Sequence, residues 1–247
     1  MFKIEKIFFN KIFLRNMYLF FTTFFLKKKK LKKYDNFLLE LDIREYTQNS
    51  MYFKDYDKDI TDFLWPQIKG NEDFIDIGAN IGFYTLFFSS LLNNGKVFSY
   101  EPNFKNFKKL KKNILLNKFK NVKCYNFGIS SQNGNAKLYD TSHYNEGGHY
   151  INLEDKSSNK KFKTIKIFKL DNLFKKNKKN LFIKIDVEGH EIHVLHGMQN
   201  ILKRSNCFLI IETGKEKGLK NITNFLKKFN YVIKKRFNIN TVYVKNL

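Results

Sequence analysis

Short apolar runs alternate with longer amphipathic stretches along most of the chain after residue 72. The apolar runs predict buried strands at 73–77, 96–101, 122–127, 181–187 and 207–212. Stretches with apolar residues three and four positions apart follow the first, second and fourth strands and predict helices at 84–92, 106–117 and 191–204. Such alternation is typical of parallel βαβ units, so the pattern predicts an α/β domain built on a mostly parallel sheet.

The end of the domain departs from this alternation. A helix predicted at 219–229 is followed by two apolar runs, at 231–237 and 241–245, with only a short polar segment between them. So short a connection predicts an antiparallel hairpin, because parallel strands need a longer crossover. The hairpin completes a predicted seven-stranded sheet. A second hairpin is predicted in the middle of the domain, around 135–140 and 161–170.

The first 72 residues precede this pattern. They predict a short strand at 36–43 and a helix at 57–68 that Asp57 caps and that ends near Pro66. A chain of 247 residues can hold one full-sized α/β domain, but not two such domains with separate cores. We therefore expect three parts: an N-terminal extension at 1–35, a strand and helix preamble at 36–72, and the main domain at 73–247.

The extension is aromatic, apolar and basic. Its longest uncharged run, residues 16–26, would span about 17 Å as a helix, whereas the hydrocarbon core of a bilayer is about 30 Å thick. It leads into Lys27–Lys30 and lacks the small residues of a signal-peptide cleavage site. We expect a helical extension. It either lies on an anionic inner membrane face, with its lysines towards the head groups, or packs on the domain with the lysines in solvent.

The chain carries a formal net charge of +23, which favours a nucleic acid, a membrane surface or an acidic glycan as partner. Nearly all of this charge is lysine, however, and lysine is abundant together with asparagine, isoleucine and phenylalanine, as an AT-biased coding sequence would produce. Arginine, whose planar fork suits phosphates and bases, occurs only at Arg15, Arg44, Arg204 and Arg236. We therefore expect no specific nucleic-acid partner.

The two cysteines, Cys124 and Cys207, both fall in predicted strands. Neither a disulfide framework nor a zinc-binding spacing is present. Cysteine usage thus favours a reduced, cytoplasmic protein. Peripheral contact with the inner membrane face through the N-terminal extension is one of the two alternatives given above.

The segment DFIDIGANIGFYTLFF, residues 73–88, joins the first predicted strand to a helix through two glycines. Such a turn lets the backbone approach a ligand, and the first amides of the helix are unpaired, so it is typical of nucleotide sites. A dinucleotide fingerprint needs glycine where this chain has Asn80, between Gly78 and Gly82, and the Gly-Lys-Ser/Thr ending of a P-loop is absent. The turn therefore favours a nucleoside without phosphates, such as S-adenosylmethionine.

Two acids at strand ends fit that cofactor. Asp76 can hold the ammonium side of its amino-acid tail, directly or through water. Glu101, about 20 residues further on, can accept hydrogen bonds from both ribose hydroxyls. Each acid alone could be an ordinary strand-end carboxylate or helix cap, but the pair at this spacing favours a nucleoside site.

The segments DIGANIGFYTL, YEPN, IKIDVEGHE, VLHG and IIE occur in this order within residues 73–212. In these segments the chain resembles the FkbM family of methyltransferases. The resemblance implies a class I, Rossmann-like fold, S-adenosylmethionine as cofactor, and O-methylation, often of a sugar or polyketide hydroxyl. In a class I enzyme the adenine would lie beyond the third strand, which makes Asn126 and Gly128 candidates for that side of the site.

A second group of candidates lies in IKIDVEGHEIHVLHGM, residues 183–198. Asp186 ends the fourth strand, which in a doubly wound sheet lies beside the first, so it should face the reactive end of the cofactor. Methyl transfer to an alcohol needs a base for the hydroxyl proton. His190 is the candidate base by pKa and Asp186 by position, while Glu188 and Glu212 would orient the base or bind sugar hydroxyls.

Metal assistance is the alternative mechanism. A divalent ion held by Asp186, Glu188 and Glu212 would lower the pKa of the acceptor hydroxyl. The family resemblance does not require a metal, and we expect none. His190, His193 and His196 would sweep across a helix rather than converge on one ion.

Residues 141–150, TSHYNEGGHY, form a polar, glycine-bearing segment between predicted strands. His143, Asn145 and His149 are candidates for binding the acceptor in a lid over the site. A plain surface loop is the alternative.

We expect an enzyme that transfers a methyl group from S-adenosylmethionine to an oxygen, with a hydroxyl-bearing carbohydrate of a surface glycan or its precursor as acceptor. An RNA methyltransferase that uses the basic surface is one alternative. Amino-group methyltransferases of that kind carry Asn/Asp-Pro-Pro-Tyr/Phe where this chain reads DVEG. A catalytically silent binding module with the same fold is the other alternative.

Overall fold

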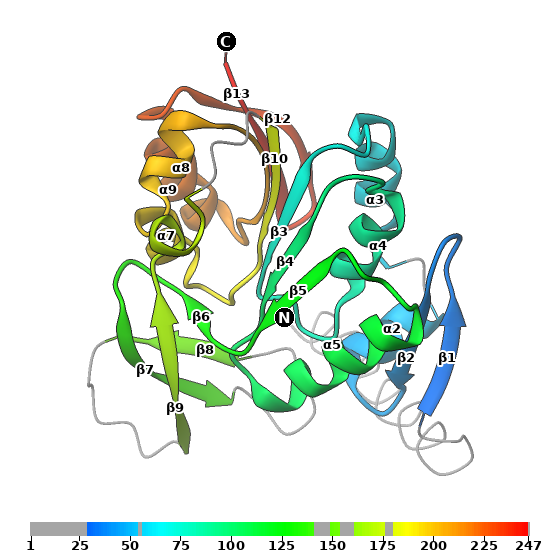
Figure 1. The fold of residues 1–247 in the computed structure, drawn as a ribbon. Helices are drawn as coiled ribbons and strands as arrows, with labels where there is room; N and C mark the ends of the chain where they lie inside the picture. Colours follow the sequence, from blue (N-terminus) through cyan, green and yellow to red (C-terminus); the bar gives the residue numbers. More distant parts are fainter. Residues whose placement is uncertain (1–28, 54–55, 141–148, 154–160, 176–179, 247) are drawn as a thin grey trace, which may run out of the picture.

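The computed structural model of the chain describes residues 29–53, 56–140, 149–153, 161–175 and 180–246 (Figure 1). Its centre is a seven-stranded sheet with the strand order β12-β13-β11-β10-β3-β4-β5. The parallel part consists of β3 (Asp73–Ile77), β4 (Val97–Tyr100), β5 (Val122–Tyr125), β10 (Asn180–Ile185) and β11 (Asn206–Glu212). The antiparallel hairpin at one edge consists of β12 (Tyr231–Phe237) and β13 (Asn240–Lys245). The predicted sheet and its C-terminal hairpin are confirmed.

Helices cover both faces of this sheet. Side chains alternate between the faces of a strand, so Phe74 belongs to one hydrophobic core and Ile75 to the other. On the side of Phe74 lie α4 (Phe83–Leu91) and α5 (Phe104–Leu116). The other side is covered by α7 (Glu191–His196), α8 (Gln199–Arg204) and α9 (Glu216–Lys227), as Figure 1 shows. None of the helices in the described residues is long and apolar enough to cross a membrane.

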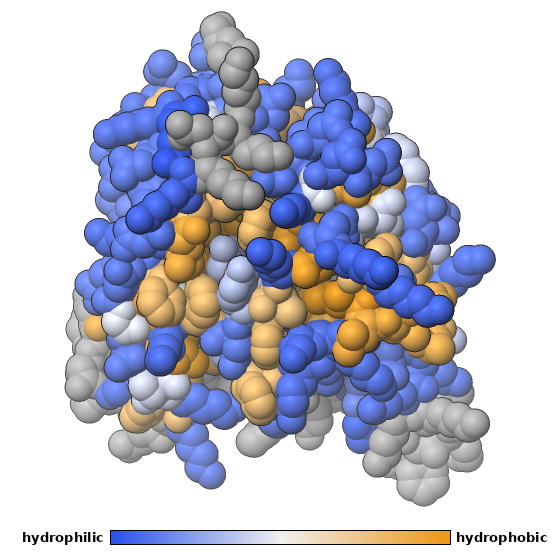
Figure 2. Space-filling model, in the orientation of Figure 1, coloured by the Kyte–Doolittle hydropathy of each residue, from blue (hydrophilic) through white to orange (hydrophobic). Residues whose placement is uncertain are grey.

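Burial on both faces explains the apolar composition of the central strands. All five positions of β3 are buried, and Phe74 stacks on Phe88 of α4 with ring centroids 3.7 Å apart. In the orientation of Figure 2, hydrophobic residues gather across the middle of the molecule and hydrophilic residues cover its outer parts. Long apolar runs in the sequence therefore mark the centre of the sheet.

The strand order reverses direction at β3. From β3 the chain runs outwards through β4 to β5, and it later returns to place β10 on the opposite side of β3. Ligands of doubly wound sheets bind outside the carboxyl ends of the strands at such a point. The carboxyl ends of β3, β4 and β10 therefore position the candidate site.

The stretch at 191–204, predicted as one helix, forms α7 and α8 instead. The break lies at Gly197, where a Cβ atom would stand 1.9 Å from the carbonyl oxygen of Ser130. Asp171 in the short helix α6 (Leu170–Leu173) accepts hydrogen bonds from the N–H groups of Asn200 and Ile201, each at 3.0 Å. A continuous helix would use these donors internally, so a contact from a distant segment explains the break.

The hairpin predicted in the middle of the domain is part of a separate four-stranded sheet. β7 (Gly134–Asp140) and β9 (Phe162–Phe168) pair antiparallel, as predicted. β6 (Gly128–Ile129) and β8 (His149–Asn152) complete the order β6-β9-β7-β8. This sheet lies near the carboxyl ends of the main strands and contributes Leu138 and Ile151 to the cavity described below.

A strand forms the last part of the predicted helical extension. β1 (Lys29–Lys33) pairs antiparallel with β2 (Leu38–Asp42), the strand predicted at the start of the preamble. Residues 1–28 lie outside the described residues, so the helical extension stays a prediction there. The backbone of Lys29–Lys33 is extended because it completes the hydrogen bonds of β2.

The β1–β2 sheet is fixed to the main domain through β2. Leu39 and Leu41 are fully buried against the core that contains α4 and α5. The N–H group of Glu40 donates to Oδ1 of Asn113 in α5 at 2.9 Å. The preamble is therefore part of the same folded unit as the main domain.

The preamble continues through α2 (Tyr46–Phe53) and α3 (Lys58–Leu64), and a 3-10 turn at Trp65–Gln67 ends it at the predicted proline. The predicted cap is wrong. Asp57 precedes α3 with a left-handed φ of 48°, whereas a capping residue has an extended backbone, and its side chain makes no capping hydrogen bond. Its carboxylate instead accepts a hydrogen bond from the hydroxyl of Tyr84 at 2.9 Å.

Candidate active site

A cavity of about 390 Å³ opens where the carboxyl ends of β3, β4 and β10 meet. The preamble forms one wall through Met51 and Ile60, and the turn between β12 and β13 forms another through Ile239. Most of the charged lining is acidic. The carboxylates are those of Asp57, Asp59, Asp76, Glu101, Asp186, Glu188 and Glu212, and Lys184 is the cation among the described lining residues. Such a lining favours ligands with positive charge or many hydrogen-bond donors.

Gly78 holds the two central strand ends together. It has a φ of 83°, and a Cβ atom there would lie 1.8 Å from the backbone oxygen of Asp186. The loop after β3 thus touches the loop after β10 backbone to backbone, which only glycine allows. Gly82, with a φ of 102°, lies outside the cavity lining, and a Cβ there would stand 2.7 Å from Leu110 of α5. The first glycine shapes the site, and the second lets α4 pack on α5.

Glu101 is buried at the end of β4 and lines the cavity. Its Oε1 accepts the N–H of Asn103 and its Oε2 the N–H of Asn80, both at 2.8 Å. Asn80 reaches this position with a left-handed φ of 50°. Burial raises the pKa of Glu101 to about 7, so its charge changes near neutral pH. A hydrogen bond from the backbone of Asn80 thus joins two of the predicted cofactor-binding residues, Asn80 and Glu101.

Asp76 lies on β3 and is 1% exposed. Its Oδ2 accepts a hydrogen bond from the Thr85 hydroxyl at 2.6 Å, and that hydroxyl lies 2.7 Å from the hydroxyl of Ser99. Burial raises the pKa of Asp76 to about 6. This fixed carboxylate lines the cavity, as predicted for a group that holds an ammonium ion.

Lys184 and Asp186 form an ion pair at the end of β10. Nζ of Lys184 donates to Oδ2 of Asp186 at 2.6 Å. Burial alone would lower the pKa of Lys184, but the charges of Asp186 and Asp76 raise it above its ordinary value. Burial alone would raise the pKa of Asp186, but the Lys184 ammonium and hydrogen bonds from Glu212 and Lys184 lower it. The lysine therefore stays protonated and Asp186 stays ionised.

Glu212 and Glu188 complete the acidic group predicted around Asp186. Burial and the charge of Asp186 raise the pKa of Glu212, so Glu212 is the protonated partner that donates to Asp186. Glu188 follows β10 with a left-handed φ of 53° and also lines the cavity. Burial and the neighbouring charges of Asp186 and Glu191 raise the pKa of Glu188 to about 7.

Sequence reasoning missed Lys184, Tyr84 and Asp57. The ring of Tyr84 lies 4.7 Å from Nζ of Lys184, and its hydroxyl binds Asp57 of the preamble. Burial raises the pKa of Asp57. The sequence did carry a signal for Lys184, because it is a lysine in an otherwise apolar strand, two positions before Asp186. No local pattern signals Asp57, because its partner is 27 residues away.

The structure separates His190 from the acids it was predicted to meet. His190 is buried outside the cavity lining, its Nε2 lies 2.9 Å from the Ser130 hydroxyl, and its ring stacks on His193. The turn at Glu188 and Gly189, with φ angles of 53° and 95°, points the chain away from the cavity before α7 begins. Burial lowers the pKa of His190 to about 3, so the ring is neutral.

Asn126 and Gly128 also lie outside the cavity lining. Nδ2 of Asn126 donates to the carbonyl oxygens of Glu101 and Pro102, at 2.8 and 3.1 Å, and so holds the loop after β4. Gly128 is buried in β6. Pro102, Leu138 and Ile151 instead give the cavity an apolar wall.

Of the predicted acceptor residues, His143 and Asn145 lie outside the described residues. His149 begins β8, opposite Asp140 of β7. Two positions further on, Ile151 lines the cavity. The lid therefore stays a prediction.

No group of three or more histidine, cysteine or acidic side chains in the described ranges is arranged to hold a metal ion. Asp186 binds Lys184 and Glu212 instead.

The doubly wound sheet with its antiparallel terminal hairpin, the glycine turn after β3 and the acid at the end of β4 define a class I methyltransferase. The lining fits S-adenosylmethionine. Glu101 would hold the ribose hydroxyls, Asp76 the ammonium group, and the apolar wall around Pro102 the adenine. The carboxylates at the ends of β3 and β4 also suit the positive charge of a sulfonium compound.

The chain belongs to the FkbM methyltransferase family, because the family model described as "Methyltransferase FkbM domain" matches residues 76–233. The predicted family is confirmed, and with it methyl transfer from S-adenosylmethionine.

One relative and two solved structures illustrate what the chain is similar to. "Hexuronic acid methyltransferase AglP" of Haloferax volcanii is 29% identical over 174 residues, which are 70% of this chain and 68% of that protein. TYW2 of M. jannaschii, solved with AdoMet, has a TM-score of 0.45 at 14% identity and covers 88% of this chain and 84% of its own. An rRNA methylase from Streptococcus thermophilus has a TM-score of 0.47 at 12% identity, with coverages of 79% and 98%.

Proposed function

We propose that the protein is an O-methyltransferase that acts on a sugar hydroxyl of a surface glycan or its precursor. The observation that carries the proposal is the carboxylate of Asp186 on the cavity wall, held by Lys184 at 2.6 Å. The Haloferax relative, named as a hexuronic acid methyltransferase, supports a carbohydrate acceptor.

S-Adenosylmethionine, when bound, supplies an electrophilic methyl group on a sulfonium sulfur, which leaves as a neutral thioether. Each carboxylate oxygen of Glu101 keeps a free lone pair beyond its backbone hydrogen bond, so both can accept from ribose hydroxyls. Asp76 is held towards the cavity by Thr85. These acids bind and orient but take no part in proton transfer.

Asp186 is the group we assign as general base. An alcohol is a weak nucleophile unless its proton is removed as the new bond forms. The hydroxyl proton of the acceptor passes to the carboxylate of Asp186. Lys184 stabilises that carboxylate without competing for the proton, because its own pKa is raised. His190, the other predicted base, faces Ser130 outside the cavity.

The remaining acids suit a polyhydroxylated acceptor. Glu188, Glu212 and Asp57 line the same cavity from three different elements and can accept hydrogen bonds from neighbouring hydroxyls. We keep His143, Asn145 and His149 as acceptor-binding residues of a lid. Support comes from Ile151, which shows that β8 reaches the cavity wall.

We further propose that the protein works in the cytoplasm and contacts the inner membrane face through its N-terminal extension. The support is the aromatic and basic sequence of residues 1–35. There the enzyme would meet membrane-bound glycan precursors.

Calorimetric titration with S-adenosylhomocysteine, with NAD and ATP as controls, tests the cofactor half of the proposal. We expect saturable binding of S-adenosylhomocysteine alone. No binding by folded protein would overturn the assignment.

Transfer of a radiolabelled methyl group to a panel of sugars and uronic acids tests the acceptor half. We expect a label that survives mild alkali, as a methyl ether does. A label that alkali releases would identify a carboxyl methyl ester and exclude hydroxyl methylation.

A further inference from the structure

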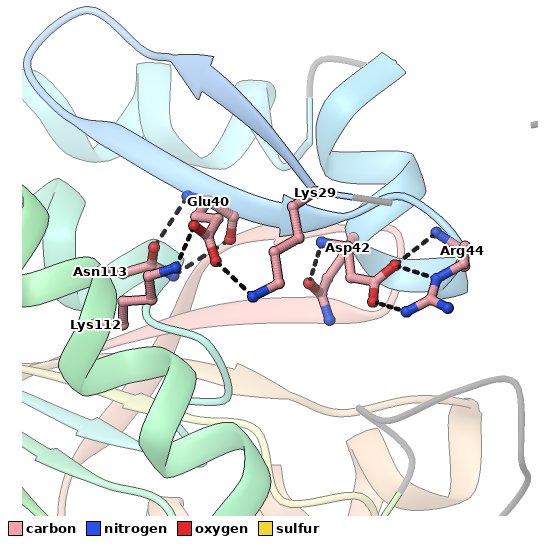
Figure 3. A network of polar contacts seen from close by, with 7 residues as sticks. Lys29, Glu40, Asp42, Arg44, Lys112 and Asn113 are labelled. Atoms are coloured by element: carbon pink, nitrogen blue, oxygen red, sulfur yellow. Dashed lines mark hydrogen bonds and ion pairs between the residues drawn. The ribbon is translucent and has the colours of Figure 1, made fainter. Parts of the chain in front are cut away.

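A second groove, of about 420 Å³, lies between α5 and the β1–β2 sheet (Figure 3). We call it the lysine groove. Its lining consists of Lys29, Lys105, Lys108, Lys109 and Lys112 together with Glu40, Asp42, Gln48 and Asn113. Five ammonium groups thus face two carboxylates.

Both carboxylates of the lysine groove are already engaged, as Figure 3 shows. Glu40 binds Lys112 and lies 3.7 Å from Lys29. Asp42 accepts from Nε and Nη2 of Arg44, at 2.8 and 2.5 Å. Arg44 also lowers the pKa of Asp42, so this acid stays ionised and neutralised by its partner. Five lysines against two carboxylates leave the groove with a net positive charge.

Two helices, α2 and α5, line both the lysine groove and the active-site cavity. In α2, Thr47 lines the cavity and Gln48 the groove. In the first turn of α5, Asn106 lines the cavity and Lys105 the groove. Adjacent residues of a helix point about 100° apart, so α2 and α5 each present one face to the cavity and a neighbouring face to the groove. One ligand could reach both.

The two sites have opposite charge. The cavity holds seven acidic side chains against Lys184 among its described lining residues, and Asp186 among them stays ionised, so the cavity would repel an anionic group. An acceptor that carries phosphate could not place that group beside Asp186. It could place its hydroxyl there and its phosphate among the lysines.

We propose that the lysine groove binds a phosphate group of the methyl acceptor. This inference rests on the proposed function, since it places the acceptor hydroxyl in the cavity. Lysine ammonium groups bind phosphate oxygens as point charges. The phosphate can belong to a soluble sugar phosphate or nucleotide sugar, or to the head group of a lipid-linked precursor. The chemistry in the groove is the same for both.

Two triple variants of the full chain, equal in charge, test the proposal. Lys105→Gln, Lys108→Gln and Lys109→Gln neutralise the groove. Lys220→Gln, Lys227→Gln and Lys228→Gln remove the same charge from exposed positions at α9, on the opposite face of the sheet. Calorimetry with inorganic pyrophosphate probes soluble phosphate, and sedimentation with phosphatidylglycerol vesicles probes lipid head groups. S-adenosylhomocysteine titration of each variant reports folding and the cofactor site.

We expect the groove variant to lose about tenfold in affinity for pyrophosphate and the α9 variant less than about twofold. Loss of vesicle binding by the groove variant alone, with pyrophosphate unaffected, would assign the phosphate to a lipid. Equal weakening of both variants with both probes, or no weakening of either, would overturn the proposal and leave only the general charge of the chain. Wild-type protein that fails to bind S-adenosylhomocysteine would instead overturn the proposed function, and the comparison of the two variants would still be readable.

Discussion

Lys184 donates to Asp186 at 2.6 Å from a position two residues earlier on the same strand end. Alternate residues of a strand share a face, so the sequence spacing alone brings both side chains to one side of the sheet. The partner of Lys184 in the register of β3 and β10 is Asp76, the acid assigned to the cofactor. One buried ammonium group thus lies between the carboxylate that would bind the cofactor and the carboxylate that would accept the proton.

Replacing Lys184 by methionine should destabilise the fold and abolish turnover. Breaking a buried ion pair leaves an uncompensated charge and costs about 3 kcal/mol of unfolding free energy. Urea unfolding measures this loss. Adding Asp186→Asn to the same chain should restore part of the stability but none of the activity. A Lys184→Met variant as stable as the wild type would contradict the ion pair.

Asp186→Asn alone should lower kcat at least about a hundredfold while the affinity for S-adenosylhomocysteine changes little. The amide keeps the shape of the side chain and removes its ability to take a proton. Asp59→Asn, which alters an exposed acid of the cavity lining that has no assigned role, is the matched control and should keep most of the turnover. Steady-state kinetics and calorimetry on both variants separate the two effects. Equal kcat losses would remove Asp186 from its role as base.

Binding of S-adenosylhomocysteine should strengthen as the pH rises through about 7. The pKa of Glu101 is raised to about 7, and only its ionised form accepts from both ribose hydroxyls, so the competent fraction falls below that pH. Asp76, with a pKa raised to about 6, should add a second decrease at lower pH. Calorimetry between pH 5.5 and pH 8.5 on the wild type and on Glu101→Gln tests this, since the variant should bind more weakly and keep only the lower step. A wild-type profile flat across this range would exclude Glu101 as the ribose acid.

Gly78→Ala should unfold the cofactor loop, whereas Gly189→Ala should be tolerated. Both glycines have a positive φ, which costs about 1 kcal/mol for alanine. At Gly78 the new Cβ would also collide with the backbone oxygen of Asp186, whereas nothing lies within 4 Å at Gly189. Only Gly78→Ala should therefore lower the melting temperature strongly and lose binding of S-adenosylhomocysteine. Similar behaviour of the two would show that the strand ends do not touch as described.

His190→Ala should lower the free energy of unfolding by about 2 kcal/mol near neutral pH, because it removes the buried contact with Ser130. It should leave kcat within about threefold of the wild type, because His190 lies outside the cavity. The pKa of the folded ring is lowered from 6.5 to about 3, so below pH 6.5 the unfolded chain binds a proton that the folded chain does not. The stabilisation of the folded state by the neutral His190 ring is therefore present above pH 6.5 and is lost as the pH falls towards 3. The stability difference between wild type and variant should shrink between pH 7.5 and pH 5. A large loss of kcat at full stability would return His190 to the mechanism.

Hydrophobic periodicity and strand-end chemistry were enough to predict the seven-stranded sheet, its terminal hairpin, the glycine turn and the acids Asp76, Glu101 and Asp186. Each of these depends on residues that are neighbours in the chain, or on the rule that ligands bind at the carboxyl ends of parallel strands. The family resemblance rested on the same segments. The break at Gly197 was not predictable in this way, because the carboxylate of Asp171 lies about 30 residues from the helix start that it caps.

The sequence by itself determined the class of fold, the cofactor and the strand ends that line the cavity, because these depend on local pattern and spacing. Only the tertiary structure decided which side chains share the cavity. It brought in Asp57 and Tyr84 from separate segments and turned His190 towards Ser130. The physical reason is that the direction of a side chain after a strand end depends on a few loop dihedrals, such as the left-handed φ of Glu188, and on contacts between residues far apart in the chain.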